Sequence, residues 1–131
     1  MQDFRKLLVW QKSHAMALSI YRVTTPFPEQ ERYGLTSQMR RAAFSIPSNI
    51  AEGCGRAGRT ELKQYLHISL GSASELDYFL LLARDLQFLT PRQHDALEAR
   101  INEIKLMLAG LIRKVSGKTT LPTEVTPNSP K

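Results

Sequence analysis

Three glycines in the stretch NIAEGCGRAGRTE, residues 49–61, have the G-x-G-x-x-G spacing of a dinucleotide-binding loop. That loop works where a β-strand enters a tight turn and then a helix, whose N-terminus holds the pyrophosphate. Here a helical pattern precedes the glycines, and no Gly-Lys-Ser/Thr of a Walker loop follows them. We therefore interpret the stretch as a connection between two helices. Gly53 or Gly55 would be the left-handed end of one helix, and Gly58 would lie in the loop before the next.

The nucleophilic and metal-ligating side chains do not form a catalytic pattern. Cys54 has an arginine nearby in sequence but no histidine to activate its thiol, so we interpret it as a small residue at a helix end. No histidine has the spacing to a carboxylate or cysteine that is typical of a metal site. The three histidines lie in different segments, at His14, His67 and His94. We expect no catalytic residue, no metal ion and no cofactor here. An enzyme acting on a small molecule would need a polar pocket with a perturbed titratable pair, and the sequence offers only Glu75 for it.

The carboxylates are also poor candidates for general acid–base catalysis. Glu75 and Asp77 are two residues apart, and side chains at that spacing point in different directions on a helix. Glu75 lies close to the core side of its predicted helix. We expect it to be a buried acid paired with an arginine, which is a structural role.

The arginines and lysines remain, because a cluster of cations can hold the phosphates of a nucleic acid without reading its sequence. Cations outnumber acids between residues 36 and 63. Those near residue 60 are predicted to meet at one end of the fold. The candidates for phosphate contacts are Arg40, Arg41, Arg56, Arg59 and Lys63, with Lys12 and Arg22 as secondary candidates.

The alternative is that these cations are structural. In that case they would form a solvated face, with ion pairs between Arg41 or Arg56 and Glu52 or Glu75. No aromatic ladder or known nucleic-acid-binding motif accompanies the charges in the sequence. The residues alone therefore leave a nucleic-acid-binding surface and a structural ion-pair network as two open interpretations.

Composition indicates one basic, globular domain. The chain has 131 residues, enough for one hydrophobic core but not for two. It contains 18 Lys and Arg against 12 Asp and Glu, a formal net charge of +6, which is compatible with a polyanionic partner. A single cysteine excludes an internal disulfide. No signal peptide or membrane-spanning stretch is evident, so we expect a cytoplasmic protein that does not contact the membrane.

Four segments have helical periodicity, and none alternates as a β-strand would. They cover about residues 8–24, 34–53, 60–86 and 90–115. Pro47 lies inside the second segment, where we expect a kink because the apolar stripe keeps its phase across it. Thr60 is the predicted N-cap of the third segment. Thr90, Pro91 and Gln93 form a predicted capping box at the start of the fourth.

Short connections between these segments predict an all-α fold, an antiparallel up-down-up-down four-helix bundle over residues 1–115. Residues 116–131 are rich in Pro, Ser and Thr and are predicted to be a disordered tail. The third helix has two apolar stripes, more than one antiparallel neighbour covers, and Phe44 lies off the main stripe of the second helix. A ring of protomers would bury both features.

Three stretches resemble a known family: VWQKSHAMALSIY (9–21), LTSQMRRAAFSIPSNIAEG (within 27–56) and HISLGSASELDYFLLLARDLQFL (67–89). They resemble the four-helix-bundle family of the 23S rRNA intervening-sequence proteins, from about Phe4 to Val115. The resemblance implies a left-handed bundle, a homopentameric barrel with a central channel, and no enzymatic activity. The polar positions that match the family pattern are Gln38, Arg41, Asn49, Glu52, Arg56 and Glu75.

The same resemblance implies a bacterial protein, encoded within a ribosomal RNA gene or elsewhere in the genome. A related group serves as the accessory protein of diversity-generating retroelements, in which a basic barrel binds nucleic acid and the reverse transcriptase. We therefore expect a non-catalytic homo-oligomer whose partners are RNA, DNA or a nucleic-acid-handling protein such as a reverse transcriptase. The alternative is a protein–protein scaffold in which Gln38, Asn49, Glu52, Glu75 and the arginines are structural.

Overall fold

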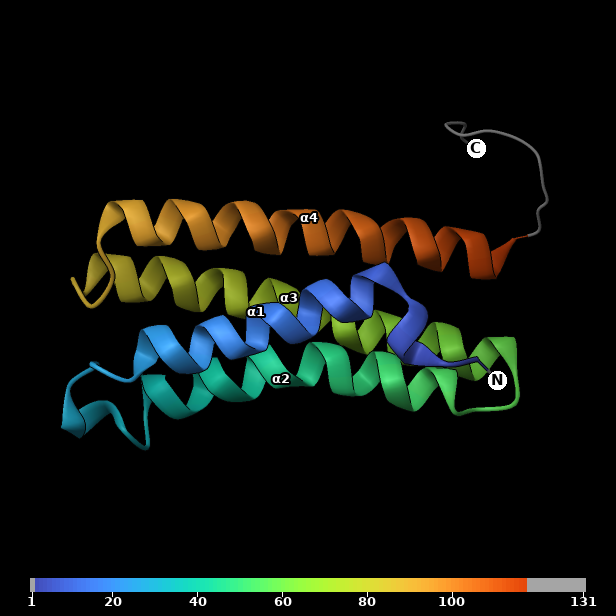
Figure 1. Ribbon diagram of the computed structural model, residues 1–131, viewed down its shortest axis with the longest axis horizontal. Coiled ribbons are helices and arrows are strands. Elements are labelled where there is room, and N and C mark those ends of the chain that lie inside the picture. The colour runs from blue at the N-terminus through green and yellow to red at the C-terminus, as the bar shows by residue number, and fades with distance from the viewer. Residues whose placement is uncertain (1, 118–131) are drawn as a thin grey trace.

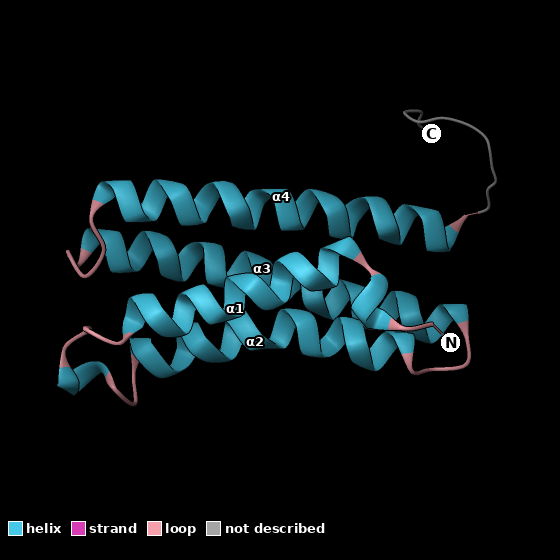
Figure 2. Cartoon of the chain, viewed as in Figure 1, coloured by secondary structure: helices cyan, strands magenta, loops and turns pink. Residues whose placement is uncertain are grey.

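The computed structural model describes residues 2–117, and helices are the only regular elements among them (Figures 1 and 2). The chain begins with a short 3₁₀ helix and then forms four α-helices, with a second 3₁₀ turn after the first of these. The elements are η1 (Phe4–Lys6), α1 (Leu8–Thr24), η2 (Glu29–Glu31), α2 (Leu35–Cys54), α3 (Arg59–Asp85) and α4 (Pro91–Ser116). The predicted all-α helical bundle is confirmed.

The chain reverses direction at each connection, so that neighbouring helices lie side by side along the bundle (Figure 1). Helices α1, α2, α3 and α4 pack in sequence order, and α4 contacts α1 over a shorter stretch. Side-chain hydrogen bonds also join neighbouring helices. Ser69 Oγ on α3, for example, donates to the Ile46 carbonyl on α2 at 2.9 Å. The left-handedness of the bundle stays a prediction.

One apolar stripe from each helix forms the core, as the periodicity predicts. Most of its large side chains are completely buried. Two buried hydroxyls, Ser13 and Thr24, donate to the carbonyls of Val9 and Ile20, so that polar groups on the inner face of α1 are satisfied within the helix. The largest fully buried apolar side chains are Met16, Ile20, Met39, Ile46, Ile50, Leu66, Leu76, Leu80, Ile101, Ile104 and Leu108.

The first residues of α3 and α4 test the two N-caps that were predicted from the sequence. Thr90 caps α4 through the predicted capping box: its hydroxyl accepts from Gln93 N at 3.1 Å, and Gln93 Oε1 accepts from Thr90 N at 2.9 Å. The prediction for α3 was wrong, because the N-cap is Gly58 and Thr60 lies inside the first turn. No side chain of the part of the chain that the structure describes caps this helix.

The expectation of a left-handed glycine after α2 was also wrong. Gly55 is the C-cap, but its φ of −81° is right-handed, and no glycine among residues 2–117 has a positive φ. Gly53 is needed for a different reason. A Cβ atom placed there would lie 2.9 Å from Tyr65 Cβ and 3.0 Å from Leu62 Cδ1, so glycine allows α2 and α3 to approach closely.

Two remaining expectations concern Pro47 and the C-terminal tail. Helix α2 continues through Pro47 to Cys54 as one element. Ser116, the first residue of the predicted tail, still belongs to α4, and Gly117 is its C-cap. The rest of that segment, 118–131, lies outside the described residues. No helix in residues 2–117 combines the length and the apolar character needed to cross a lipid bilayer.

Candidate nucleic-acid interface

One end of the bundle collects cations from three separate parts of the chain. The α2–α3 turn, the N-terminal segment with η1, and the C-terminal end of α4 all lie toward this end (Figure 1). A hydrogen bond from Gln2 N to the Cys54 carbonyl, at 3.2 Å, ties the N-terminal segment to the end of α2. We call this surface the basic end; its acids are Asp3, Glu52 and Glu61, and its cations are Arg5, Lys6, Arg56, Arg59, Lys63, Arg113 and Lys114.

Arg56 is held by contacts within the bundle. Its Nη2 donates to Glu52 Oε2 at 2.7 Å and to the Tyr65 hydroxyl at 2.9 Å, and its guanidinium lies 5.2 Å from the Tyr65 ring centroid. Tyr65 first, and Glu52 second, raise the pKa of Arg56 above its ordinary value. The pair of Arg56 and Glu52 is one of those that the structural alternative named. This arginine therefore fastens the end of α2 to α3, which is the structural interpretation.

Arg59 and Lys63 differ from Arg56. They lie one helical turn apart at the start of α3, and neither side chain makes a hydrogen bond or ion pair with another residue of the described chain. Because no side chain among residues 2–117 caps α3, its first backbone N–H groups are left to solvent or a ligand, and the positive end of the helix dipole lies here. Two unpaired cations and an uncapped helix N-terminus are suited to holding a phosphate.

The other predicted phosphate-binding residues do not join this surface. Arg40 donates to Thr24 Oγ1 at 2.9 Å and to the Tyr21 carbonyl at 3.2 Å, which occupies it at the far end of α1. Arg22 lies in the last turn of α1, also far from the basic end. Lys12 pairs with Glu103 of α4 at 3.4 Å. Arg41 is exposed, in the first half of α2.

Sequence reasoning missed four cations of the basic end: Arg5, Lys6, Arg113 and Lys114. They lie far from residue 60 in sequence, and only the alternating direction of the helices brings them there. A signal was available for two of them. Arg113 and Lys114 lie in the last turn of α4, and an up-down-up-down order places that turn beside the start of α3.

The predicted structural polar residues have mixed outcomes. Asn49 donates to the Ser45 carbonyl at 2.8 Å, and Gln38 is exposed. The prediction for Glu75 was wrong: it is exposed and has no ion pair with a residue of 2–117, because its position turns outward from the core stripe of α3. Its neighbour Asp77 makes the inter-helix bond instead, accepting from Lys105 Nζ at 3.2 Å.

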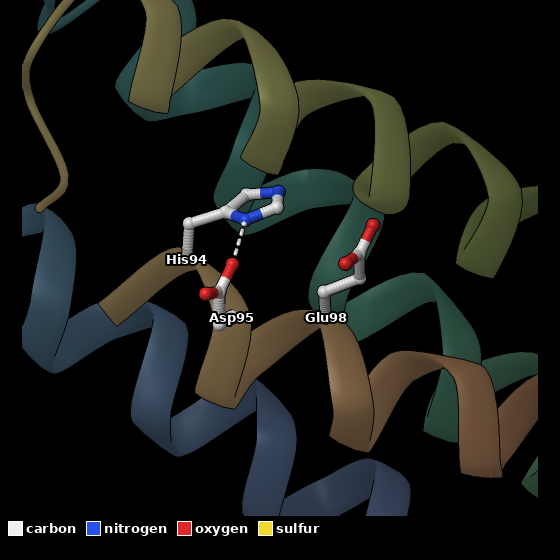
Figure 3. Close-up of side chains that lie close together, drawn as sticks. All are labelled: His94, Asp95 and Glu98. Carbon is white, nitrogen blue, oxygen red and sulfur yellow. Dashed lines mark hydrogen bonds and ion pairs between the residues drawn. The ribbon is translucent and has the colours of Figure 1, made fainter. Parts of the chain in front are cut away.

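A possible cation site near the start of α4 does not fit a metal well. Three potential ligand atoms of His94, Asp95 and Glu98 lie within 4.8 Å of one another (Figure 3). However, they come from the first two turns of one helix, whose dipole opposes a cation there. His94 Nδ1 is already bonded to Asp95 Oδ1 at 3.0 Å, and Nε2 lies on the other side of that ring. Asp95 itself is largely exposed.

Cys54 is buried at the end of α2. Burial raises the pKa of its thiol, which keeps it protonated near neutral pH. A protonated, inaccessible thiol is a weak nucleophile, which agrees with the interpretation of Cys54 as a packing residue.

The comparisons with known proteins agree with this architecture. The sequence matches the profile of the family described as 23S rRNA-intervening sequence protein over residues 5–110. The chain belongs to this family. One similar solved structure is a protein of unknown function of the S23 ribosomal protein family from Bacteroides thetaiotaomicron, with 27% sequence identity and a TM-score of 0.74. The match covers 82% of this chain and 100% of that one. The comparison with curated proteins gives no match.

The family resemblance inferred from the sequence is thereby confirmed. It extends over the region that forms η1 and the four α-helices, up to Gly110 in α4. The link to diversity-generating retroelements stays a prediction. Membership in the 23S rRNA-intervening sequence family does not by itself assign an activity, so the function must be argued from the surface.

Proposed function

We propose that this protein is a non-catalytic, homo-oligomeric helical bundle of the bacterial cytoplasm that binds RNA or DNA through the basic end. The observation that carries the proposal is the pair Arg59 and Lys63, unpaired within the described chain and set among the other cations of that end. Cations without internal partners are free to replace the counterions of a phosphate backbone. The contacts would be to phosphates, so we expect little sequence specificity.

Assembly would strengthen such binding. Helix α3 has an outward apolar stripe beside its core stripe: Ile68 and Leu86 are exposed, and Phe79 and Leu82 are half-buried. Glu75 is the stripe's one acid, and Phe44 on α2 is also exposed. We propose that copies of the chain pack against this stripe. A ring of five, as the resemblance implies, would bring several basic ends to the same side and add their phosphate contacts.

The second candidate function is a protein–protein scaffold whose arginines are structural. Arg56 favours it, because its bonds to Glu52 and Tyr65 give that arginine a role without any ligand. The partner would then be a protein, for example a nucleic-acid-handling protein such as a reverse transcriptase. The two proposals differ at Arg59 and Lys63, for which the scaffold provides no internal role.

A filter-binding titration with mixed RNA and DNA distinguishes nucleic-acid binding from the scaffold function. We expect binding that weakens steeply with salt, and a slope of log affinity against log salt that falls by about one for each phosphate-contacting cation removed. Arg59→Ala and Lys63→Ala should each weaken binding several-fold, roughly, while the oligomer stays intact. Arg92→Ala is the matched control, since Arg92 is exposed and unpaired among residues 2–117 but starts α4 at the opposite end.

Two results would overturn the proposal. One is no binding at about 50 mM salt, and the other is binding without salt dependence. If Arg56→Ala lowers stability or assembly while Arg59→Ala and Lys63→Ala change nothing, the scaffold is the better account. Equal losses for Arg92→Ala and Arg59→Ala would show that net charge, rather than the basic end, drives the binding.

A further inference from the structure

Three aromatic rings contact one another in succession from the N-terminal segment along α1. The Phe4 and Trp10 ring centroids lie 4.9 Å apart with their planes at 60°, and Trp10 and His14 stack nearly parallel, 5.0 Å apart with 8° between planes. The guanidinium of Arg5 lies 4.5 Å from the centre of the Phe4 ring. One cation and three rings thus follow one another in a continuous row.

The row adjoins the basic end. Phe4 and Arg5 belong to η1, which contacts α2, and Gln2 is bonded to the last residue of that helix. Trp10 and His14 are one turn apart on α1, so the row extends from the cations of the basic end along this helix. A chain of phosphates that reaches Arg5 or Lys6 would bring its bases close to these rings.

His14 is the last of the three rings, and its position suggests a role other than packing. Packing of Phe4 on Trp10 holds η1 against α1, and both side chains are half-buried against the core. His14 is exposed and adds nothing to the core, yet its ring lies flat on the indole. One face of His14 is covered by Trp10, and no other ring or cation of the described chain lies on it. An exposed flat ring that is backed by an indole is suited to stacking with a nucleobase.

We infer that the Trp10–His14 stack is a nucleobase-stacking site, and that the basic end therefore binds single-stranded nucleic acid in preference to duplex. The inference rests on the proposed function, because the phosphates must be held first. In a single strand the bases can leave their neighbours and stack on protein rings, whereas in a duplex they are paired inside. Every base has a π-face, so the site is tolerant of sequence.

Trp10 provides a direct signal, because it is the only tryptophan in the chain. The full-length protein is titrated with a poly-dT oligonucleotide, a poly-rU oligonucleotide of the same length, and a duplex of that length, while Trp10 emission is recorded. A base stacked on His14 lies one ring away from the indole, close enough to quench its emission. We expect quenching with both single strands, in step with binding measured by filter retention, and weaker binding with little quenching for the duplex. The two single strands show whether the sugar matters.

Substitutions at His14 separate stacking from charge. His14→Ala should weaken single-strand binding by about tenfold and abolish the preference over duplex. His14→Phe keeps a flat ring and should restore the preference, whereas His14→Lys keeps a cation without a ring and should not. His67→Ala is the matched control, since His67 is exposed on α3 and stacks on no ring of residues 2–117. His14 is exposed, so these variants should fold.

The outcomes distinguish this inference from the proposed function. If the wild type binds no nucleic acid, the proposed function fails and the stacking site fails with it. If binding is present and salt-dependent, but His14→Ala keeps the single-strand preference or Trp10 emission does not change, the stacking site alone is overturned. If His14→Lys keeps full single-strand binding and its preference over duplex while His14→Phe loses them, the stacking site is also overturned, because charge would then explain the contact.

Discussion

At the residue scale, His94 is a buried polar side chain whose hydrogen bonding is incomplete within residues 2–117. It is 2% exposed, and its Nε2 is the sole buried side-chain polar atom in residues 2–117 without a hydrogen-bond partner there. An unsatisfied buried polar atom typically costs about 1–3 kcal/mol. We predict that His94→Leu, of similar size, raises the free energy of unfolding by about 1 kcal/mol in urea denaturation.

His67→Leu is the control for this prediction, because His67 is exposed and its replacement should leave the urea midpoint nearly unchanged. The bond from His94 to Asp95 contributes little, since Asp95 is exposed and regains water when the bond is lost. A lower midpoint for His94→Leu than for the wild type would contradict the prediction.

Residue types and spacing were sufficient to predict that the cations of residues 56–63 lie together, but they missed those of η1 and α4 and did not show what each cation does. Arg56, Arg59 and Lys63 lie together as expected, yet Arg56 is bonded to Glu52 and Tyr65 while the other two are unpaired in the described chain. Tyr65 is nine residues from Arg56, so that contact depends on how the turn folds. Glu75 shows the same limit, because a small rotation of α3 decides whether it is buried.

At the element scale, the close approach of α2 and α3 at Gly53 yields a sharp prediction. A Cβ at Gly53 would overlap Tyr65 Cβ, which belongs to the stem of its side chain and cannot move without moving α3. Gly53→Ala should therefore lower the free energy of unfolding by about 1–3 kcal/mol. Chemical denaturation of the variant and the wild type, monitored by circular dichroism, measures the difference.

Gly110 in α4 provides the matched substitution. A Cβ there would meet only Arg113 Nη2 at 3.7 Å, an ordinary contact with a flexible side chain. Because alanine has a higher helix propensity than glycine, Gly110→Ala should stabilise the protein by up to about 1 kcal/mol. Opposite signs for the two variants support tight packing at Gly53. If both variants are more stable than the wild type, helix propensity outweighs the contact at Gly53 and the prediction is contradicted.

The helix boundaries were predictable where a local rule applied and not where packing decided. The capping box at Thr90 depends on residues within one turn, and the sequence predicted it correctly. The glycines at the end of α2 were misread, because Gly53 lies inside that helix, where it allows close contact with α3, and no left-handed glycine follows it in residues 2–117. A general preference of glycine for helix ends could not reveal a neighbour that arrives from another helix.

At the scale of the whole molecule, the excess of positive charge lies mostly at one end. Cations from the N-terminal segment, the α2–α3 turn and the end of α4 gather there, whereas at the other end several arginines have nearby acids, such as Arg32 with Glu29 and Arg84 with Asp85. A field of one sign at one end orients a polyanion on approach. Net charge alone predicted a polyanionic partner but not this polarity, which arises from the topology.

The outward stripe of α3 predicts how the molecule assembles. Ile68 is 50% exposed in that stripe, whereas Leu106 is 74% exposed on α4 with polar or small residues one turn away on either side.

We expect light scattering to give the wild type a mass that is a multiple of the chain mass. Ile68→Glu would bury an unpaired carboxylate between protomers and should weaken assembly by roughly a hundredfold or more, while Leu106→Glu leaves the mass unchanged. Circular dichroism should show both variants folded, because both side chains face solvent in one chain. A monomeric wild type, or equal masses for Ile68→Glu and the wild type, would exclude this stripe as the contact between copies.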